Sequence, residues 1–293
     1  PDLYPLFTNE YYGYYALKDL RAERAYVLYA TESYADTVQG CVNSLNTFSQ
    51  LPVYVYMLNS DRKINGATCI NWKCDVQDLV QTPYIDRSSS AIYRTLIQRP
   101  RIVKDAILNY AKTVAYIDAD SVVTKYVDRI FEMYNDALAY PYFVEGIYEY
   151  LFSNGRGGAE SKEDLSSTLE HPACTLFNVD QYVRNKYRQT GYFVVGENAT
   201  RFLDEWWWMC NHPEVLHNPQ LYAPYHEETI ANVLLWKYNI QDGLPYIYTN
   251  GSINEVNNYA FLGIERHIKD WVKIPRNEED LLFYHGEKDL NVM

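Results

Sequence analysis

The segment Thr113-Val114-Ala115-Tyr116-Ile117-Asp118-Ala119-Asp120 decides the fold, because an unbroken apolar run leads directly into two aspartates. A run that does not alternate between apolar and polar residues is typical of a central strand in a parallel sheet, where both faces are covered. In open α/β sheets, ligands bind beyond the carboxyl ends of such strands. We therefore expect Asp118 and Asp120 to lie at the functional edge of an α/β domain.

The segments before this strand predict a parallel sheet. Residues 25–30 and 53–58 are short apolar runs that end in polar residues, and residues 34–48 repeat apolar side chains every three or four positions. This order is a βαβ unit, whose right-handed crossover makes its strands parallel. A weaker strand is predicted at 67–72, and a helix at 91–110 with an interruption near Pro100.

The segments after the two aspartates continue the α/β pattern without a linker or an internal repeat. We predict strands near 137–143 and 190–195, helices near 128–134, 199–210 and 226–238, a mobile loop at 153–170, and a last apolar element at 281–284. A single compact domain accommodates all of them.

The composition excludes several classes of protein. The chain has 38 Asp and Glu against 26 Lys and Arg, a net charge of -12, so it would repel a nucleic acid backbone. No long apolar run or signal peptide is present, so we expect a cytoplasmic chain that does not associate with membranes. The five cysteines have no zinc-finger spacing and are expected to be reduced and buried.

Asp118 and Asp120 predict a metal site. Two carboxylates one residue apart at a strand end can present oxygens to one Mg²⁺ or Mn²⁺, and that ion can bridge the phosphates of a donor substrate. His285 could complete this site, because imidazole also binds Mn²⁺. Gly286 would let the backbone approach phosphate and Lys288 would supply a positive charge. The alternative is that both segments are ordinary turns after strands.

Other candidate binding residues stand near strand ends and helix starts. Arg94 begins the basic helix before the metal strand and could face the phosphates. Thr31 and Tyr34 follow the first strand, where they could contact the base or ribose, although Thr31 could instead cap the next helix. Glu227 begins the helix at 226–238. It either faces a transferred sugar or an acceptor hydroxyl, or it stabilises the helix start through the helix dipole.

Three consecutive tryptophans mark the helix at 199–210. The helical period places Trp206 in the core and leaves Trp207 or Trp208 available to stack on a sugar.

The order of these features resembles the GT-A fold glycosyltransferases, and among them family 8, which contains glycogenin and lipopolysaccharide galactosyl- and glucosyltransferases. The resemblance covers about residues 26–288 and rests on motifs that follow the family's order more closely than they match its exact residues. They are Leu28-Tyr29-Ala30-Thr31, Tyr93-Arg94, Tyr116-Ile117-Asp118-Ala119-Asp120, Gln189-Thr190-Gly191, Glu227-Glu228-Thr229-Ile230-Ala231-Asn232 and His285-Gly286-Glu287-Lys288.

The resemblance implies a Rossmann-like, mostly parallel sheet flanked by helices, and transfer of a hexose from a UDP-sugar with retention of configuration. It implies Mn²⁺ (or Mg²⁺) bound by Asp118, Asp120 and His285, and donor contacts by Thr31, Tyr34, Arg94, Asp118, Ala119, Gly286 and Lys288. It also places Glu227 and Gln189 in the catalytic centre, where this chain departs from the family's usual Asp and Asn. Residues 1–24 would be an extension, 25–142 the nucleotide-binding half, and 143–293 the acceptor-binding half with the C-terminal metal ligand.

Two other functions are compatible with these motifs. A sugar-phosphate nucleotidyltransferase also combines a nucleotide-binding sheet with metal-binding aspartates, but its Gly-rich loop is absent after Ala30. A catalytically silent carbohydrate-binding protein could keep the fold and use its 30 tyrosines as a contact surface. The acceptor is not specified by the sequence: a carbohydrate, a protein or a small molecule would each fit.

Overall fold

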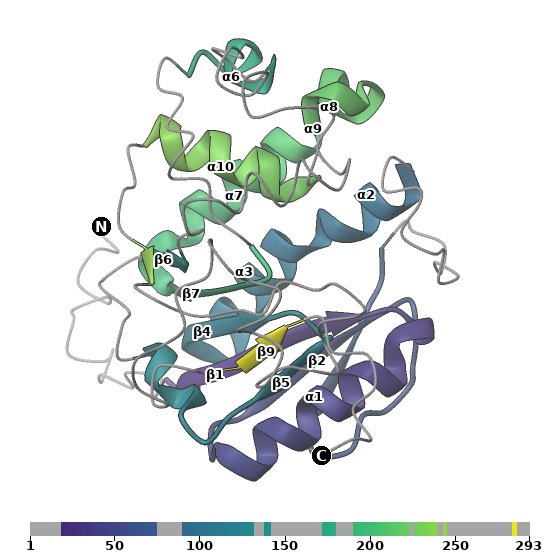
Figure 1. Cartoon of the computed structure of the whole chain (residues 1–293), viewed down its shortest axis with the longest axis vertical. Helices are drawn as coiled ribbons and strands as arrows, with labels where there is room; N and C mark the ends of the chain where they lie inside the picture. Colours follow the sequence, from purple (N-terminus) through teal and green to yellow (C-terminus); the bar gives the residue numbers. More distant parts are fainter. Residues whose placement is uncertain are drawn as a thin grey trace, which may run out of the picture.

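The computed structural model of the chain describes residues 19–74, 90–131, 138–141, 172–179, 190–222, 226–238, 243–244 and 283–285 (Figure 1). In this part of the chain, a seven-stranded sheet has the order β3-β2-β1-β4-β7-β6-β8. The strands are β1 (Ala22–Ala30), β2 (Val53–Leu58), β3 (Thr68–Trp72), β4 (Ala111–Ile117), β6 (Leu138–Pro141), β7 (Tyr192–Gly196) and β8 (Gly243–Leu244).

The strand pairing confirms the predicted fold class, an α/β domain with a Rossmann-like, mostly parallel central sheet. β1 pairs in parallel with β2 and β4, and β2 pairs in parallel with β3. β7 runs antiparallel to both β4 and β6. β4 is therefore central, as predicted, but it is parallel to its neighbour on one side only.

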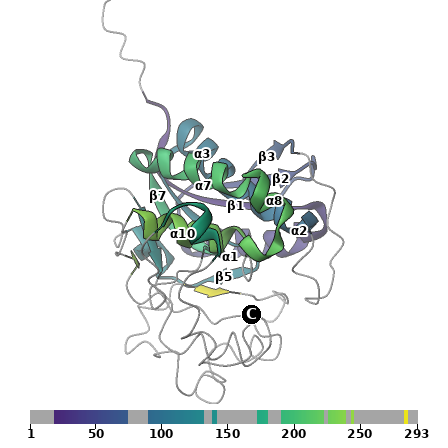
Figure 2. The ribbon, with the colours of Figure 1, turned by 90° about the horizontal axis from the view of Figure 1, so that it is seen from above.

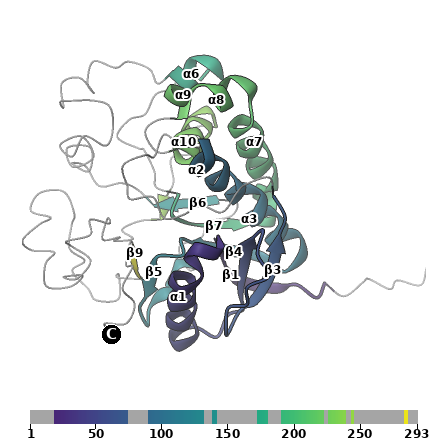
Figure 3. The same cartoon turned by 90° about the vertical axis from the view of Figure 1, so that its right-hand side faces the viewer.

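Helices cover both faces of the sheet (Figure 3). Helix α1 (Ala35–Phe48) lies on one face, and α3 (Gln98–Asn109) and α7 (Thr200–Cys210) lie on the other. Because side chains alternate along a strand, β1 contributes Tyr26 and Leu28 to the core under α1, and Val27 and Tyr29 to the core under α3 and α7. The apolar run of each inner strand is thus divided between two cores.

The remaining helices extend the α3 and α7 side of the molecule (Figure 1). They are α2 (Ser90–Leu96), α6 (Pro172–Leu176), α8 (Pro213–His217), α9 (Pro219–Tyr222) and α10 (Glu227–Lys237). Two short 3-10 helices, η2 (Glu32–Tyr34) and η5 (Glu197–Ala199), precede α1 and α7, and a third, η3 (Val127–Phe131), replaces the first part of the helix predicted at 128–134.

The helix predicted at 91–110 is interrupted near Pro100, as predicted, although not at the proline itself. The break lies at Ile97, between α2 and α3, and Pro100 is the third residue of α3. Proline is tolerated in the first turn of a helix, because the N–H groups there have no partner within the helix. The interruption therefore precedes the proline, which lies inside the new helix.

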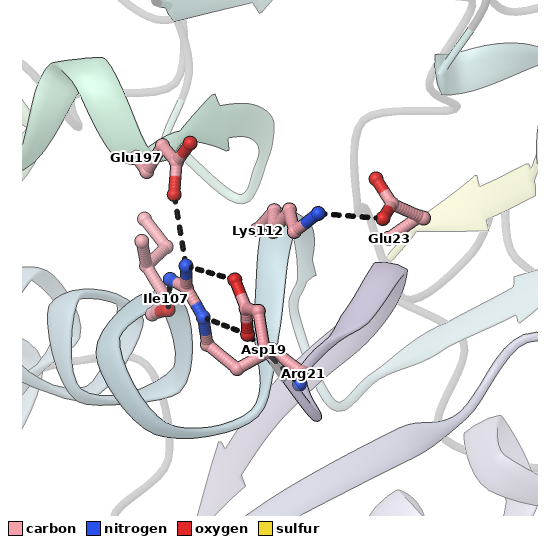
Figure 4. A network of polar contacts seen from close by, with 6 residues as sticks. All are labelled: Asp19, Arg21, Glu23, Ile107, Lys112 and Glu197. Carbon is pink, nitrogen blue, oxygen red and sulfur yellow. Dashed lines mark hydrogen bonds and ion pairs between the residues drawn. The ribbon is translucent and has the colours of Figure 1, made fainter. Parts of the chain in front are cut away.

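An ionic network fixes the start of β1 (Figure 4). The Arg21 guanidinium donates to both carboxylate oxygens of Asp19, to Glu197 and to the carbonyl oxygen of Ile107 at 2.8 Å. Hydrogen bonds from Arg21 lower the pKa of Asp19 to about 2. Exposed ion pairs contribute little to stability, so the network adds only a weak link between the start of β1 and the end of α3.

The three tryptophans of α7 have different environments, as the helical period predicts. Trp206 is fully buried and its indole Nε1 donates to the Glu227 carbonyl at 2.9 Å. Trp207 is half-buried against Arg101, whereas 57% of Trp208 is exposed. Burial in the core and exposure to solvent thus fall to different tryptophans of the run.

All five cysteines are free thiols, as predicted, but only three of them are buried. Cys41, Cys174 and Cys210 lie in the cores, whereas Cys69 within β3 and Cys74 after it are partly exposed. Among the described helices, none combines the length and the apolar character needed to cross a membrane. The loop predicted at 153–170 lies outside the described residues.

Candidate functional site

The predicted functional edge forms where β1 and β4 end. The two strands are parallel neighbours with Val27 opposite Tyr116, so Thr31 and Asp118, which follow them, emerge at the same edge. Thr31 is buried and its Oγ1 lies 2.9 Å from Ser33 Oγ. It makes no side-chain capping bond to η2, so the capping role is not observed. Tyr34 is half-buried against the core under α1.

A two-stranded ribbon brings the C-terminal motif to this edge. β5 (Ser121–Val123) pairs in antiparallel fashion with β9 (Phe283–His285), beside α1 (Figure 2). The Cα register places His285 opposite Ser121, the residue that follows Asp120. The backbone thus joins the two segments predicted to share a metal. The His285 side chain and residues Gly286 and Lys288 lie outside the described part of the chain.

The two aspartates are half-buried at the end of β4. Asp118 is held by its backbone, because its N–H donates to the Gly191 carbonyl at 2.7 Å. Its Oδ1 accepts a hydrogen bond from the Tyr116 hydroxyl at 2.5 Å and from Arg99 at 3.0 Å. Ala119, between the aspartates, packs partly against the core under α1. Asp118 is therefore oriented before any ligand binds.

Arg99 links Asp118 to the first turn of α10. Its side chain is 4% exposed, and its Nη1 lies 2.6 Å from both Glu227 Oε1 and Thr190 Oγ1. The guanidinium also lies 4.8 Å from the ring centroid of Tyr116. Burial alone would lower the pKa of Arg99, but Tyr116, Asp118 and Glu227 raise it well above its usual range. Arg99 is therefore a permanent buried cation between two carboxylates.

The two glutamates that begin α10 are both buried. Burial raises the pKa of Glu227, and Arg99 opposes this shift. Burial also raises the pKa of Glu228 to about 8. Glu228 Oε2 accepts a hydrogen bond from the Thr190 N–H at 2.9 Å. Glu227 Oε2 is buried and has no hydrogen-bond partner among the described residues, so its capacity to accept a hydrogen bond is not used within them.

Arg99 is the residue that sequence reasoning missed. Arg94, the arginine selected from the basic helix, is exposed on α2. A signal was present in the sequence, because Arg99 shares the helical face of Ile102, Val103 and Ala106, all of which are buried. A buried arginine almost always has a partner, and Asp and Glu side chains are the usual buried anions. Gln189, the other predicted catalytic residue, lies outside the described residues.

The described side chains of the site offer two carboxylates to a cation. No group of three His, Cys, Asp or Glu residues that could hold a metal occurs among the described side chains. The donor chemistry of Asp118 and Asp120 nevertheless suits Mg²⁺ or Mn²⁺, which prefer oxygen ligands. Ser121 Oγ, next to Asp120, is buried without a partner among the described residues, so a further hydroxyl at this edge has no hydrogen bond within them.

Comparison with known proteins gives structural but not sequence matches. No protein-family model and no curated protein sequence matches the chain. The galactosyltransferase LgtC, in complex with donor and acceptor sugar analogues, is 13% identical with a TM-score of 0.48, over 89% of this chain and 86% of its own. A glycosyltransferase involved in glycosylation of the major capsid of PBCV-1 is 11% identical with a TM-score of 0.43, over 92% and 96%.

A third similar structure is the glycosyltransferase GlyE of Streptococcus pneumoniae TIGR4. It is 14% identical with a TM-score of 0.47, over 91% of this chain and 55% of its own. The similar solved structures named here are all glycosyltransferases. TM-scores below 0.5 at identities of 11–14% assign neither a family nor a substrate to this chain.

Proposed function

We propose that this chain is a metal-dependent glycosyltransferase that moves a hexose from a UDP-sugar to an acceptor with retention of configuration. The observation that carries the proposal is the register of β5 with β9, which sets His285 opposite the residue after Asp120. Two motifs far apart in the sequence thereby meet at the carboxyl edge of a nucleotide-binding type of sheet. Neither motif alone is specific, but their meeting supports a shared ligand.

The proposed cation ligands are Asp118, Asp120 and His285. A bound Mn²⁺ or Mg²⁺ would neutralise the charge that develops on a departing nucleoside diphosphate. The chain itself is acidic, with a net charge of -12, so a phosphorylated substrate needs such a positive centre. Lys288 and Gly286 are proposed to contact the diphosphate, as is the exposed Arg94.

Thr31, Tyr34 and Ala119 are proposed to line the nucleoside side of the site. Thr31 lies at the end of β1, and Tyr34 lies three residues further along, in η2. The carboxyl end of β1 adjoins that of β4, so a ligand held at Asp118 extends naturally over these residues.

Glu227 and Arg99 are proposed to hold the sugar. The oxygen of Glu227 that lacks a described partner can accept a hydrogen bond from a hydroxyl of the transferred sugar or of the acceptor. Arg99 keeps the other oxygen of Glu227 and Oδ1 of Asp118 in fixed positions. Such preorganisation lowers the cost of orienting a substrate in the reacting complex. Gln189 is proposed to face the same sugar, by resemblance alone.

The test is a nucleotide-release assay with a panel of UDP-sugars and Mn²⁺, with EDTA as the metal-free arm. We expect metal-dependent release of UDP that is abolished in Asp120→Asn. A matched control is Asp204→Asn, which removes a carboxylate 58% exposed on α7 and should leave the rate unchanged. Release that persists in EDTA, or in Asp120→Asn, would overturn the proposal.

The same assay distinguishes the proposed function from both alternative functions. A sugar-phosphate nucleotidyltransferase would release pyrophosphate from a nucleoside triphosphate and a sugar phosphate, and would not release UDP from a UDP-sugar. A catalytically silent carbohydrate-binding protein would be stabilised against heating by sugars without releasing any nucleotide.

A further inference from the structure

The backbone of His226 adopts a conformation that is rare for residues other than glycine. Its φ is 61° and its ψ is -126°, at the junction between α9 and α10. The other described non-glycine residues with positive φ are Asn59 and Asn178, and asparagine tolerates this region far better than other residues with a side chain. A φ near +60° with a ψ near -120° belongs to the first central position of a type II′ turn, where glycine dominates. His226 is therefore strained.

A backbone hydrogen bond and aromatic packing hold this conformation in place. The His226 N–H donates to the Tyr222 carbonyl at 2.7 Å. Its ring is buried beside the stacked pair Tyr93 and Tyr222, with centroid distances of 6.3 and 5.9 Å. Strained residues persist only where their surroundings over-determine them, and they cluster at functional sites. The aromatic rings are the surroundings that do this here.

The strained residue directly precedes Glu227. The dihedrals of residue 226 set the direction in which α10 starts, and therefore where the first side chain of α10 points. The Glu227 side chain lies 2.6 Å from Arg99, and the Glu227 backbone carbonyl accepts a hydrogen bond from the Trp206 indole N–H. His226 makes no side-chain capping bond to α10. Capping therefore does not explain a bulky residue at this position.

We infer that His226 is a positioning residue, whose ring, packed beside the stacked rings of Tyr93 and Tyr222, holds the backbone turn that directs the Glu227 carboxylate toward Arg99. This inference rests on the proposed function, because it treats Glu227 as the sugar-facing carboxylate. It assigns no proton transfer to the imidazole. The ring acts through its packing, which fixes the backbone dihedrals of residue 226 and so the position of Glu227.

Two substitutions separate positioning from ordinary packing. His226→Ala removes the ring and its packing against the two tyrosines but keeps a Cβ, so we expect the backbone to relax to negative φ and Glu227 to move away from Arg99. His226→Gly also removes the ring, but glycine adopts this turn without strain. We expect kcat to fall about 100-fold in His226→Ala, as for a displaced catalytic group, and glycine to restore it to within about threefold of wild type. Equal losses in both variants, or no loss in His226→Ala, would refute the inference.

A crystal structure of each variant gives a readout that does not depend on activity. We expect a positive φ at 226 and an intact Glu227–Arg99 contact in wild type and His226→Gly, and a negative φ with a broken contact in His226→Ala. If the contact survives in His226→Ala, the positioning role is wrong even if the protein is a glycosyltransferase. If the structures behave as expected but wild type releases no UDP, the proposed function fails and the turn mechanism stands.

Discussion

Replacing Arg99 by methionine should destabilise the protein in a way that depends on pH. Methionine fills a similar volume but leaves Glu227, which is 2% exposed, without its cation. Removing one partner of a buried ion pair typically costs about 3–5 kcal/mol. Asp118 is more exposed, at 23%, so water can solvate it and most of the cost falls on Glu227.

The size of the effect follows from the pKa of Glu227. Without Arg99, the buried carboxyl takes up a proton, and each pH unit above its ordinary pKa of 4.5 costs about 1.4 kcal/mol. The cost is then at most about 3 kcal/mol at pH 7 and less than about 1 kcal/mol at pH 5. The sign follows from a folded-state pKa raised above the unfolded one, so stability is retained at pH 4.5 and lost as the pH rises.

Denaturation by urea at pH 5 and pH 7, followed by tryptophan fluorescence, measures this difference. The double variant Arg99→Met with Glu227→Gln should lose the pH-dependent part, because no buried carboxyl remains to be neutralised. Arg101→Met is the matched control on the same helix, where an exposed guanidinium near Trp72 and Trp207 contributes at most about 1 kcal/mol. A loss in Arg99→Met that is below about 1 kcal/mol, or equal at both pH values, would refute the buried-cation argument.

Two further predictions concern the core around α10. Because burial raises the pKa of Glu228 to about 8, wild type should lose stability relative to Glu228→Gln by about 1.4 kcal/mol per pH unit between pH 4.5 and 8, measured by thermal denaturation across that range. Equal slopes in the two proteins would contradict the pKa shift. Trp206→Ala should cost about 3–5 kcal/mol, because the buried indole also donates to the Glu227 carbonyl, whereas Trp208→Ala on the exposed side should cost less than about 1 kcal/mol. Comparable losses by chemical denaturation would show that the two faces of α7 are wrongly assigned.

The sequence alone determined the elements and the ends of the inner strands. Apolar runs ending in polar residues located β1, β2 and β4, and the three- and four-residue spacing located α1, α7 and α10, because these periods follow from local backbone geometry. The position of Asp118 and Asp120 at a carboxyl end followed directly. The direction of β7 did not, since an apolar strand reads the same whether its neighbour is parallel or antiparallel.

The grouping of the site residues was decided only by the tertiary structure. The register of β9 against β5, which sets His285 opposite Ser121, depends on pairing between segments that share no local signal. The burial of Arg99 depends on the first turn of α10, where Glu227 lies 2.6 Å from the guanidinium and supplies the anion. Local periodicity indicates which face of a helix is buried. Which element covers that face depends on contacts between residues far apart in the sequence. For that reason the sequence was enough to identify Asp118 and Asp120 as candidate site residues. Only the position of α10 showed that Arg99, and not Arg94, is the arginine buried beside Asp118.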